Sequence, residues 1–159
     1  MRRKKSLIKL NIIKYNEDQN LIKILSYCVM PDHYHLLIKF YSYGLSKYIS
    51  DVENSYTRYF NIKYKRKGPL WQTRYKHVKI INNEQLLHVS RYIHLNPVTN
   101  KLVDKPEDWV FSSYKHFITN NNINDVTEIS IKSSKKYKRF VEDQIDYQRR
   151  LKLIKRHNI

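Results

Sequence analysis

Two apolar stretches near the start of the chain, 21–29 and 33–40, are rich in residues typical of strands. The sequence Met30-Pro31-Asp32 between them is a turn sequence, in which Pro31 sets the backbone φ angle. This pattern predicts a β-hairpin. The preceding segment, 7–15, fits either a strand or a helix, because its apolar residues satisfy both spacings.

Apolar residues recur at helical spacing in two later segments, 45–62 and 82–95. Asn82 or Asn83 can cap the second helix, and Pro97 is expected to end it, because the residue before a proline disfavours the α region. The segment between these helices, 70–80, is aromatic and β-prone. The segment 101–117 is expected to be a connector that packs back on the domain.

The composition of the chain divides it into three parts. Residues 1–118 carry the apolar patterning and are expected to form one domain. Residues 119–132 are polar and Asn-rich, which is typical of a linker. Residues 133–159 form a basic, helical tail with too few apolar residues for a core of its own. Such a helix is either a solvated surface or a helix laid along a nucleic-acid backbone.

The charge of the chain points to a polyanionic partner. Lys and Arg total 31 against 14 Asp and Glu, a formal charge of +17, and 14 tyrosines accompany them. Aromatic faces stack on unpaired bases while cations follow the phosphates, so nucleic acid is the expected partner. A compositional bias toward Lys, Asn, Ile and Tyr is the alternative explanation.

Other functional classes are disfavoured by the composition. The single cysteine, Cys28, excludes an internal disulfide framework and a cysteine-based zinc finger. No apolar stretch is long enough to cross a bilayer, and the basic first residues are not followed by a signal-peptide core. We therefore expect a cytoplasmic protein without membrane contact.

Two histidines one residue apart, His33 and His35, stand at the start of the second predicted strand. Alternate side chains of a strand point to the same face, so both imidazoles can reach one ion. A His-x-His pair on a strand is also common as a purely structural feature, so the pair alone is a weak motif.

The predicted helix that ends near Pro97 carries Tyr92 and Asn96 on one face, because they are four residues apart. The amide of Asn96 can complete a metal site begun by two histidines, and the phenol of Tyr92 can attack a phosphodiester near that metal. Alternatively, Tyr92 only packs and Asn96 only ends the helix.

Four motifs follow one another along the chain: YCVMPDHYHLLI at 27–38, GPLWQTRY at 68–75, RYIHLNPV at 91–98 and DWVFSSY at 108–114. In this order they resemble the IS200-like single-tyrosine transposases, specifically the branch of REP-associated tyrosine transposases. The resemblance covers roughly residues 21–117, and the combination is far more specific than any one motif.

The resemblance implies an α+β, ferredoxin-like antiparallel sheet with helices on one face, as in HUH single-strand DNA endonucleases. It implies that His33 and His35 bind Mg²⁺ or Mn²⁺, that Asn96 is a third polar ligand and that Tyr92 is the nucleophile. The expected product is a 5′-phosphotyrosine with a free 3′-hydroxyl, formed on single-stranded or hairpin DNA.

Basic and aromatic residues next to these motifs are the candidates for DNA binding. They are Lys65, Arg66 and Lys67 in a basic loop, and Trp71, Gln72, Arg74 and Tyr75 in the second motif. For the second group, a role in forming the strand is an equal alternative.

One departure from the family pattern is expected to matter. Only about 20 residues precede the first predicted strand, where family members usually carry a first core strand and a helix. We therefore expect a decayed copy, a mis-assigned start or a form completed as a homodimer. The alternative to an active enzyme is a descendant that grips hairpin DNA or RNA without cutting; a metal-independent, toxin-like ribonuclease is a weaker alternative.

Overall fold

The computed structural model describes residues 22–40, 44–119, 131 and 133–150. The ambiguous segment 7–15, nearly all of the predicted linker 119–132, and the last tail residues, 151–159, lie outside this description. The chain divides into two compact units, each described here by itself. One comprises Met1–Lys23 and Phe40–Leu70, and the other comprises Ile24–Lys39 and Trp71–Ile159.

The predicted hairpin is present in the larger unit. Strands β1 (Ile22–Val29) and β2 (Tyr34–Phe40) form a two-stranded antiparallel sheet. The backbone N–H of Met30 donates to the carbonyl of His33 over 2.8 Å and closes the turn. The other edge of β1 pairs with the segment 111–113, where Cys28 lies opposite Ser112. The α+β class is therefore confirmed.

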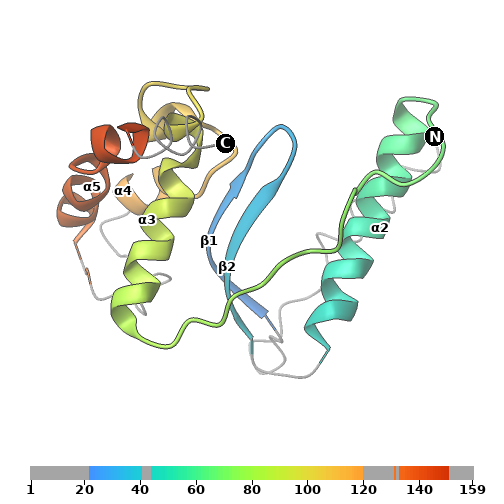
Figure 1. Cartoon of the computed structure of the whole chain (residues 1–159), viewed down its shortest axis with the longest axis horizontal. Helices are drawn as coiled ribbons and strands as arrows, with labels where there is room; N and C mark the ends of the chain where they lie inside the picture. The colour runs from blue at the N-terminus through green and yellow to red at the C-terminus, as the bar shows by residue number, and fades with distance from the viewer. Residues whose placement is uncertain (1–21, 41–43, 120–130, 132, 151–159) are drawn as a thin grey trace. The chain divides into compact units, whose positions relative to one another are not determined.

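Helix α3 (Asn83–Thr99) lies beside the hairpin (Figure 1). Its start agrees with the prediction, because the side chain of Asn82 accepts a hydrogen bond from the backbone of Gln85 over 2.7 Å. Its end does not, because Pro97 lies inside the helix. Proline has no backbone N–H, so the helix loses a hydrogen bond at Pro97, but this loss is confined to its last turn. The buried ring of Pro97 adds apolar contact there. Asn96 consequently belongs to regular helix.

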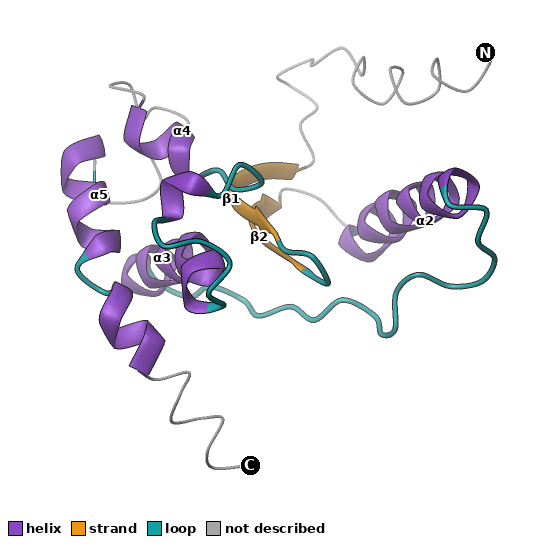
Figure 2. Cartoon of the chain, turned by 90° about the horizontal axis from the view of Figure 1, so that it is seen from above, coloured by secondary structure: helices purple, strands orange, loops and turns teal. Residues whose placement is uncertain are grey.

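Two apolar clusters hold α3 in place. Ile93 packs with the hairpin residues Leu25, Cys28, Met30 and Leu37. On another side of the helix, Leu95 joins a second cluster with Tyr114, Phe117, Tyr137 and Val141. Helix α3 therefore has the hairpin on one side and two further helices on another (Figure 2).

Those two helices are α4 (Tyr114–Thr119) and α5 (Ser134–Glu142), with a 3₁₀ turn, η2 (Pro106–Asp108), before them. The connector packs back as predicted, since the indole N–H of Trp109 donates to the carbonyl of Val29 over 2.9 Å. The described part of the basic tail is helical at 134–142 and at 145–150, with a turn at 143–144 between the two stretches. It is more than a solvated surface, because α5 contributes buried side chains to the core.

The β-prone segment 70–80 does not form a strand, so the alternative role in strand formation is wrong for its residues. The segment has no regular secondary structure, and among the described residues no strand pairs with it. Its apolar residues alternate poorly. Because no partner strand is available, its backbone N–H and C=O groups are left to form hydrogen bonds with water. It runs as an irregular connection to α3.

The smaller unit contains helix α2 (Leu45–Lys63), as predicted. Gly44 precedes it with a φ of 101°, a left-handed conformation that glycine adopts without steric cost. The aromatic side chains of α2 contact one another, as Tyr56 does Phe60, and among the described residues none of this helix is buried. Of the helices described, none has the length and apolar character needed to cross a bilayer.

Candidate functional site

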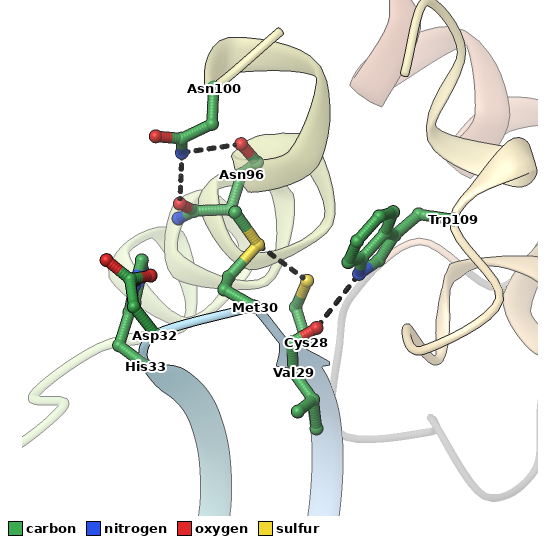
Figure 3. Close-up of polar contacts among 8 residues, drawn as sticks. All are labelled: Cys28, Val29, Met30, Asp32, His33, Asn96, Asn100 and Trp109. Atoms are coloured by element: carbon green, nitrogen blue, oxygen red, sulfur yellow. Dashed lines mark hydrogen bonds and ion pairs between the residues drawn. The ribbon is translucent and has the colours of Figure 1, made fainter. Parts of the chain in front are cut away.

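The two histidines lie at the start of β2, with their rings edge-to-face and their centroids 4.9 Å apart. Nδ1 of His33 lies 2.6 Å from a carboxylate oxygen of Asp32, which belongs to the hairpin turn (Figure 3). A histidine held this way at Nδ1 presents its other nitrogen, Nε2, away from the carboxylate. The tight turn thus supplies a carboxylate that orients His33.

Helix α3 brings Tyr92 to the same place. The ring of Tyr92 contacts the ring of His35 at a centroid distance of 5.4 Å and an angle of 76°. The side chain of Tyr92 is 50% exposed, so the ring that contacts His35 is also accessible to solvent. The structure therefore brings the side chains of His33, His35 and Tyr92 together.

Asn96 lies one turn along α3 from Tyr92 and is 5% exposed. Its side-chain oxygen accepts a hydrogen bond of 3.0 Å from the amide of Asn100, which also donates to the Asn96 carbonyl (Figure 3). Within the described residues, Nδ2 of Asn96 and Nε2 of His35 are both buried without a hydrogen-bond partner. Two unsatisfied polar atoms so close to Tyr92 mark a position prepared for a further group.

Burial lowers the pKa of His35 below its usual value, and the neighbouring His33 lowers it further. The side chain of Asn96 lies close enough to raise this pKa slightly, although Nε2 and Nδ2 do not reach ordinary hydrogen-bond geometry. A lowered pKa keeps the imidazole neutral, which is the form that binds a metal ion. Rotation of the Asn96 amide would turn its oxygen, the harder ligand, toward the same point.

The described part of the chain contains no group of three or more His, Cys, Asp or Glu side chains placed to hold a metal ion. The candidate donor set is instead two imidazoles and one amide. Nitrogen and amide-oxygen donors are compatible with Mn²⁺ and, less favourably, with Mg²⁺. The unpartnered Nε2 of His35 fits such an ion.

Sequence reasoning missed two residues of this site. Asp32 was assigned only to the turn, although a carboxylate adjacent to a histidine is a recognisable signal for an orienting partner. Asn100, directly after α3, continues the four-residue spacing of Tyr92 and Asn96. It was missed because the helix was expected to end near Pro97.

The DNA-binding candidates of the second motif lie on the irregular segment before α3. Trp71 is half-buried and packs edge-on against Tyr34, with ring centroids 5.5 Å apart. Gln72 and Arg74 are exposed, and the ring of Tyr75 lies 5.9 Å from that of His77. Trp71 therefore anchors the segment on β2 beside the histidines, and the polar residues after it face solvent.

The basic loop that follows α2 belongs to the smaller unit and has a defined internal structure. The guanidinium of Arg66 donates to the side-chain oxygen of Asn61 over 3.1 Å and to the carbonyl of Pro69 over 2.7 Å. The amide of Asn61 donates to the carbonyl of Gly68 over 2.9 Å. Arg66 therefore holds the loop together, and the exposed Lys65 and Lys67 flank it.

Comparison with known proteins agrees with this geometry. Residues 4–96 match the family described as "Transposase IS200 like", a range that includes both histidines, Tyr92 and Asn96. The chain is also 31% identical over 101 residues to a protein of Haemophilus influenzae named "Putative REP-associated tyrosine transposase". That alignment covers 55% of this chain and 56% of the relative, so the chain spans little more than half of the relative's length. No solved structure matches the chain. Because the family match extends over more than half of its residues, the chain belongs to the IS200-like transposase family.

Proposed function

We propose that this protein is a metal-dependent transposase that nicks and rejoins single-stranded or hairpin DNA through a covalent 5′-phosphotyrosine intermediate on Tyr92. The observation that carries the proposal is the contact between Tyr92 and His35, with their ring centroids 5.4 Å apart. A half-exposed phenol beside a pair of histidines combines a nucleophile with a candidate metal site.

In the proposed reaction, the phenol of Tyr92 gives up its proton and its oxygen attacks the scissile phosphorus. The bond from phosphorus to the 3′-oxygen breaks, and that oxygen leaves as a hydroxyl after taking up a proton. Attack by a 3′-hydroxyl on the phosphotyrosine reverses these steps and frees Tyr92. No net phosphodiester energy is lost, so rejoining needs no additional cofactor.

The residues around Tyr92 would hold the metal. His33 and His35 would each supply a ring nitrogen, and Asn96 would supply its amide oxygen. A bound Mg²⁺ or Mn²⁺ supplies positive charge to the scissile phosphate and offsets the charge that develops there. Asp32 keeps His33 in a fixed orientation through its contact with Nδ1. To supply its oxygen, the Asn96 amide would rotate and give up the hydrogen bond that its oxygen accepts from Asn100.

The substrate class follows from charge and exposure. A formal charge of +17 favours a phosphate backbone, and a tyrosine that is 50% exposed can reach a strand that is not enclosed in a duplex. Exposed polar residues of the segment before α3, such as Arg74, can contact phosphates, and the half-buried rings of Trp71 and Tyr75 are candidates for contacts with unpaired bases.

The test is incubation of the full chain with 5′- or 3′-labelled hairpin oligonucleotides and Mn²⁺, followed by a denaturing gel. A covalent protein–DNA adduct should form and should disappear in Tyr92→Phe, while binding measured by gel shift stays unchanged. Tyr147→Phe is the matched control, because that tyrosine is similarly exposed, at 56%. Undiminished adduct in Tyr92→Phe would remove Tyr92 from the mechanism. DNA binding without any adduct would favour the non-cutting descendant.

A further inference from the structure

A buried polar network connects α3 to the C-terminal helix α5. Nδ1 of His94 lies 2.8 Å from the hydroxyl of Tyr137, and that hydroxyl donates to Oγ of Ser90 over 3.0 Å. On the other side of the ring, Nε2 of His94 lies 2.8 Å from Oγ of Ser113. Oγ of Ser113 in turn accepts from the backbone N–H of Tyr27 on β1 over 2.9 Å.

The donation from Tyr137 to Ser90 sets the order of the other donors. The hydroxyl proton of Ser113 is shared between Nε2 of His94 and the carbonyl of Tyr27, 3.3 Å away. Burial lowers the pKa of His94 to about 3, so its ring is neutral and carries one proton. Since the Tyr137 hydroxyl donates to Ser90, the Nδ1–H of His94 donates to Tyr137. Nε2 of His94 then accepts from Ser113, and Ser90 donates to the carbonyl of Leu87 over 2.8 Å. Each named side-chain group has a partner, which makes such a network rigid.

The contacts of α5 fall on the side of α3 that faces away from the candidate site. With 3.6 residues per turn, Ser90 and His94 lie roughly opposite Tyr92 and Asn96 around the helix axis. The side chains of Tyr137, His94 and Ser90 are each 1% exposed or less. The network therefore fixes the position of α3 from behind Tyr92.

A second contact acts beside this network. The guanidinium of Arg91 lies over the ring of Phe140, 4.3 Å from its centroid. Helix α5 thus contacts Ser90 and Arg91 before Tyr92 in the sequence, and His94 after it.

We propose that Tyr137 is a positioning residue that sets the rotation and height of α3 and so presents Tyr92 to His35. Apolar packing is non-directional and would allow α3 small rotations or slides, whereas two hydrogen bonds from one hydroxyl to adjacent turns of the helix do not. This inference rests on the proposed function of Tyr92, and it gives α5 a task distinct from DNA binding.

The experiment compares Tyr137→Phe with Val141→Ala in the full chain. Tyr137→Phe keeps the buried ring and removes the hydroxyl. Val141 is fully buried in the same cluster but has no part in the network, so Val141→Ala reports the effect of reduced packing alone. Adduct formation is measured under single-turnover conditions with saturating hairpin DNA, well below both unfolding temperatures. A second readout, the NMR resonances of the His35 ring, reports the position of the Tyr92 ring without requiring activity.

Tyr137→Phe should slow adduct formation at least about 10-fold, since small misplacements of reacting groups cost one to two orders of magnitude in rate. DNA affinity should stay unchanged, and the His35 resonances should move. Val141→Ala should change neither the rate nor these resonances. If Tyr137→Phe does not fold, Ser90→Ala removes one of the two bonds and should give the same pattern.

Equal rates in Tyr137→Phe and the unsubstituted protein, with unmoved His35 resonances, would overturn the inference. So would an equal effect of Val141→Ala. Failure of the proposed function is recognised separately, because adduct formation would then persist in Tyr92→Phe while the NMR comparison still reports whether α5 positions Tyr92.

Discussion

The ring of Tyr92 meets the ring of His35 nearly at right angles, with centroids 5.4 Å apart. One residue belongs to a helix and the other to the hairpin, so their contact depends on how α3 packs on β1 and β2. Ile93, directly after Tyr92, is 2% exposed and joins the hairpin core. The packing that stabilises the fold thereby also brings the nucleophile to the histidine pair.

Removal of any one candidate ligand should weaken Mn²⁺ binding. We expect His33→Ala, His35→Ala and Asn96→Ala each to weaken Mn²⁺ affinity, measured by isothermal titration calorimetry. Asp32→Asn should have a smaller effect, of about 10- to 100-fold, because it only loosens the orientation of His33.

The matched control for these variants is His116→Ala, which removes an exposed imidazole on α4. It should leave Mn²⁺ affinity unchanged. Unaltered Mn²⁺ affinity in both His33→Ala and His35→Ala would place any metal elsewhere in the protein.

Local pattern was sufficient to predict the hairpin, α2 and α3, whereas the residues of the candidate site were singled out by the resemblance of four ordered motifs to a known family. The faces of His35 and Tyr92 could be predicted because each lies on a regular element whose periodicity fixes its face. The course of 70–80 could not be predicted from composition, since a strand forms only where a partner strand is available. The burial of Tyr137 escaped prediction for a related reason, because its partners on α3 are distant in the sequence and its neighbours on α5 are mostly charged.

In the basic loop after α2, we expect the two lysines to bind DNA and Arg66 to stabilise the loop. Lys65→Ala and Lys67→Ala should each reduce the slope of log binding constant against log salt by about 0.7 for every single-strand phosphate that the lysine neutralises. Arg66→Ala should instead lower stability, since it removes the hydrogen bonds to Asn61 and Pro69. Fluorescence anisotropy at several salt concentrations and thermal melts of each variant test this. A salt slope that is insensitive to both lysines would exclude the loop from the DNA interface.

The buried His94 predicts acid sensitivity. Its pKa is about 3 in the folded protein and near 6.5 in the unfolded chain, so between these values the unfolded state binds the additional proton. Stability is therefore complete above about pH 6.5 and decreases toward pH 3, by at most about 1.4 kcal/mol per pH unit from this group. Urea titrations at pH 4 to 7 measure the free energy of unfolding at each pH. This free energy should change less with pH in His94→Gln than in His116→Gln, the control at an exposed site. Equal slopes would show that other groups dominate acid unfolding.

The tail should be separable into a structural part and a charged part. Tyr137 and Val141 are at most 1% exposed and pack with Leu95, Tyr114 and Phe117. Burial of two such side chains stabilises the fold by roughly 3 to 6 kcal/mol, a large share of the total stability of a small domain. Deletion of 133–159 should therefore unfold the larger unit rather than only weaken DNA binding.

Deletion of 151–159 should behave differently. It removes Lys152, Lys155 and Arg156 but leaves α5 and its contacts with α3 intact. Affinity for all oligonucleotides should fall by a similar factor, with a smaller salt dependence and an unchanged melting temperature and cleavage position. A shifted cleavage position would show that these last residues read the DNA sequence. An unchanged melting temperature after deletion of 133–159 would contradict the structural task of α5, because the core residues around Leu95 would then be stable without it.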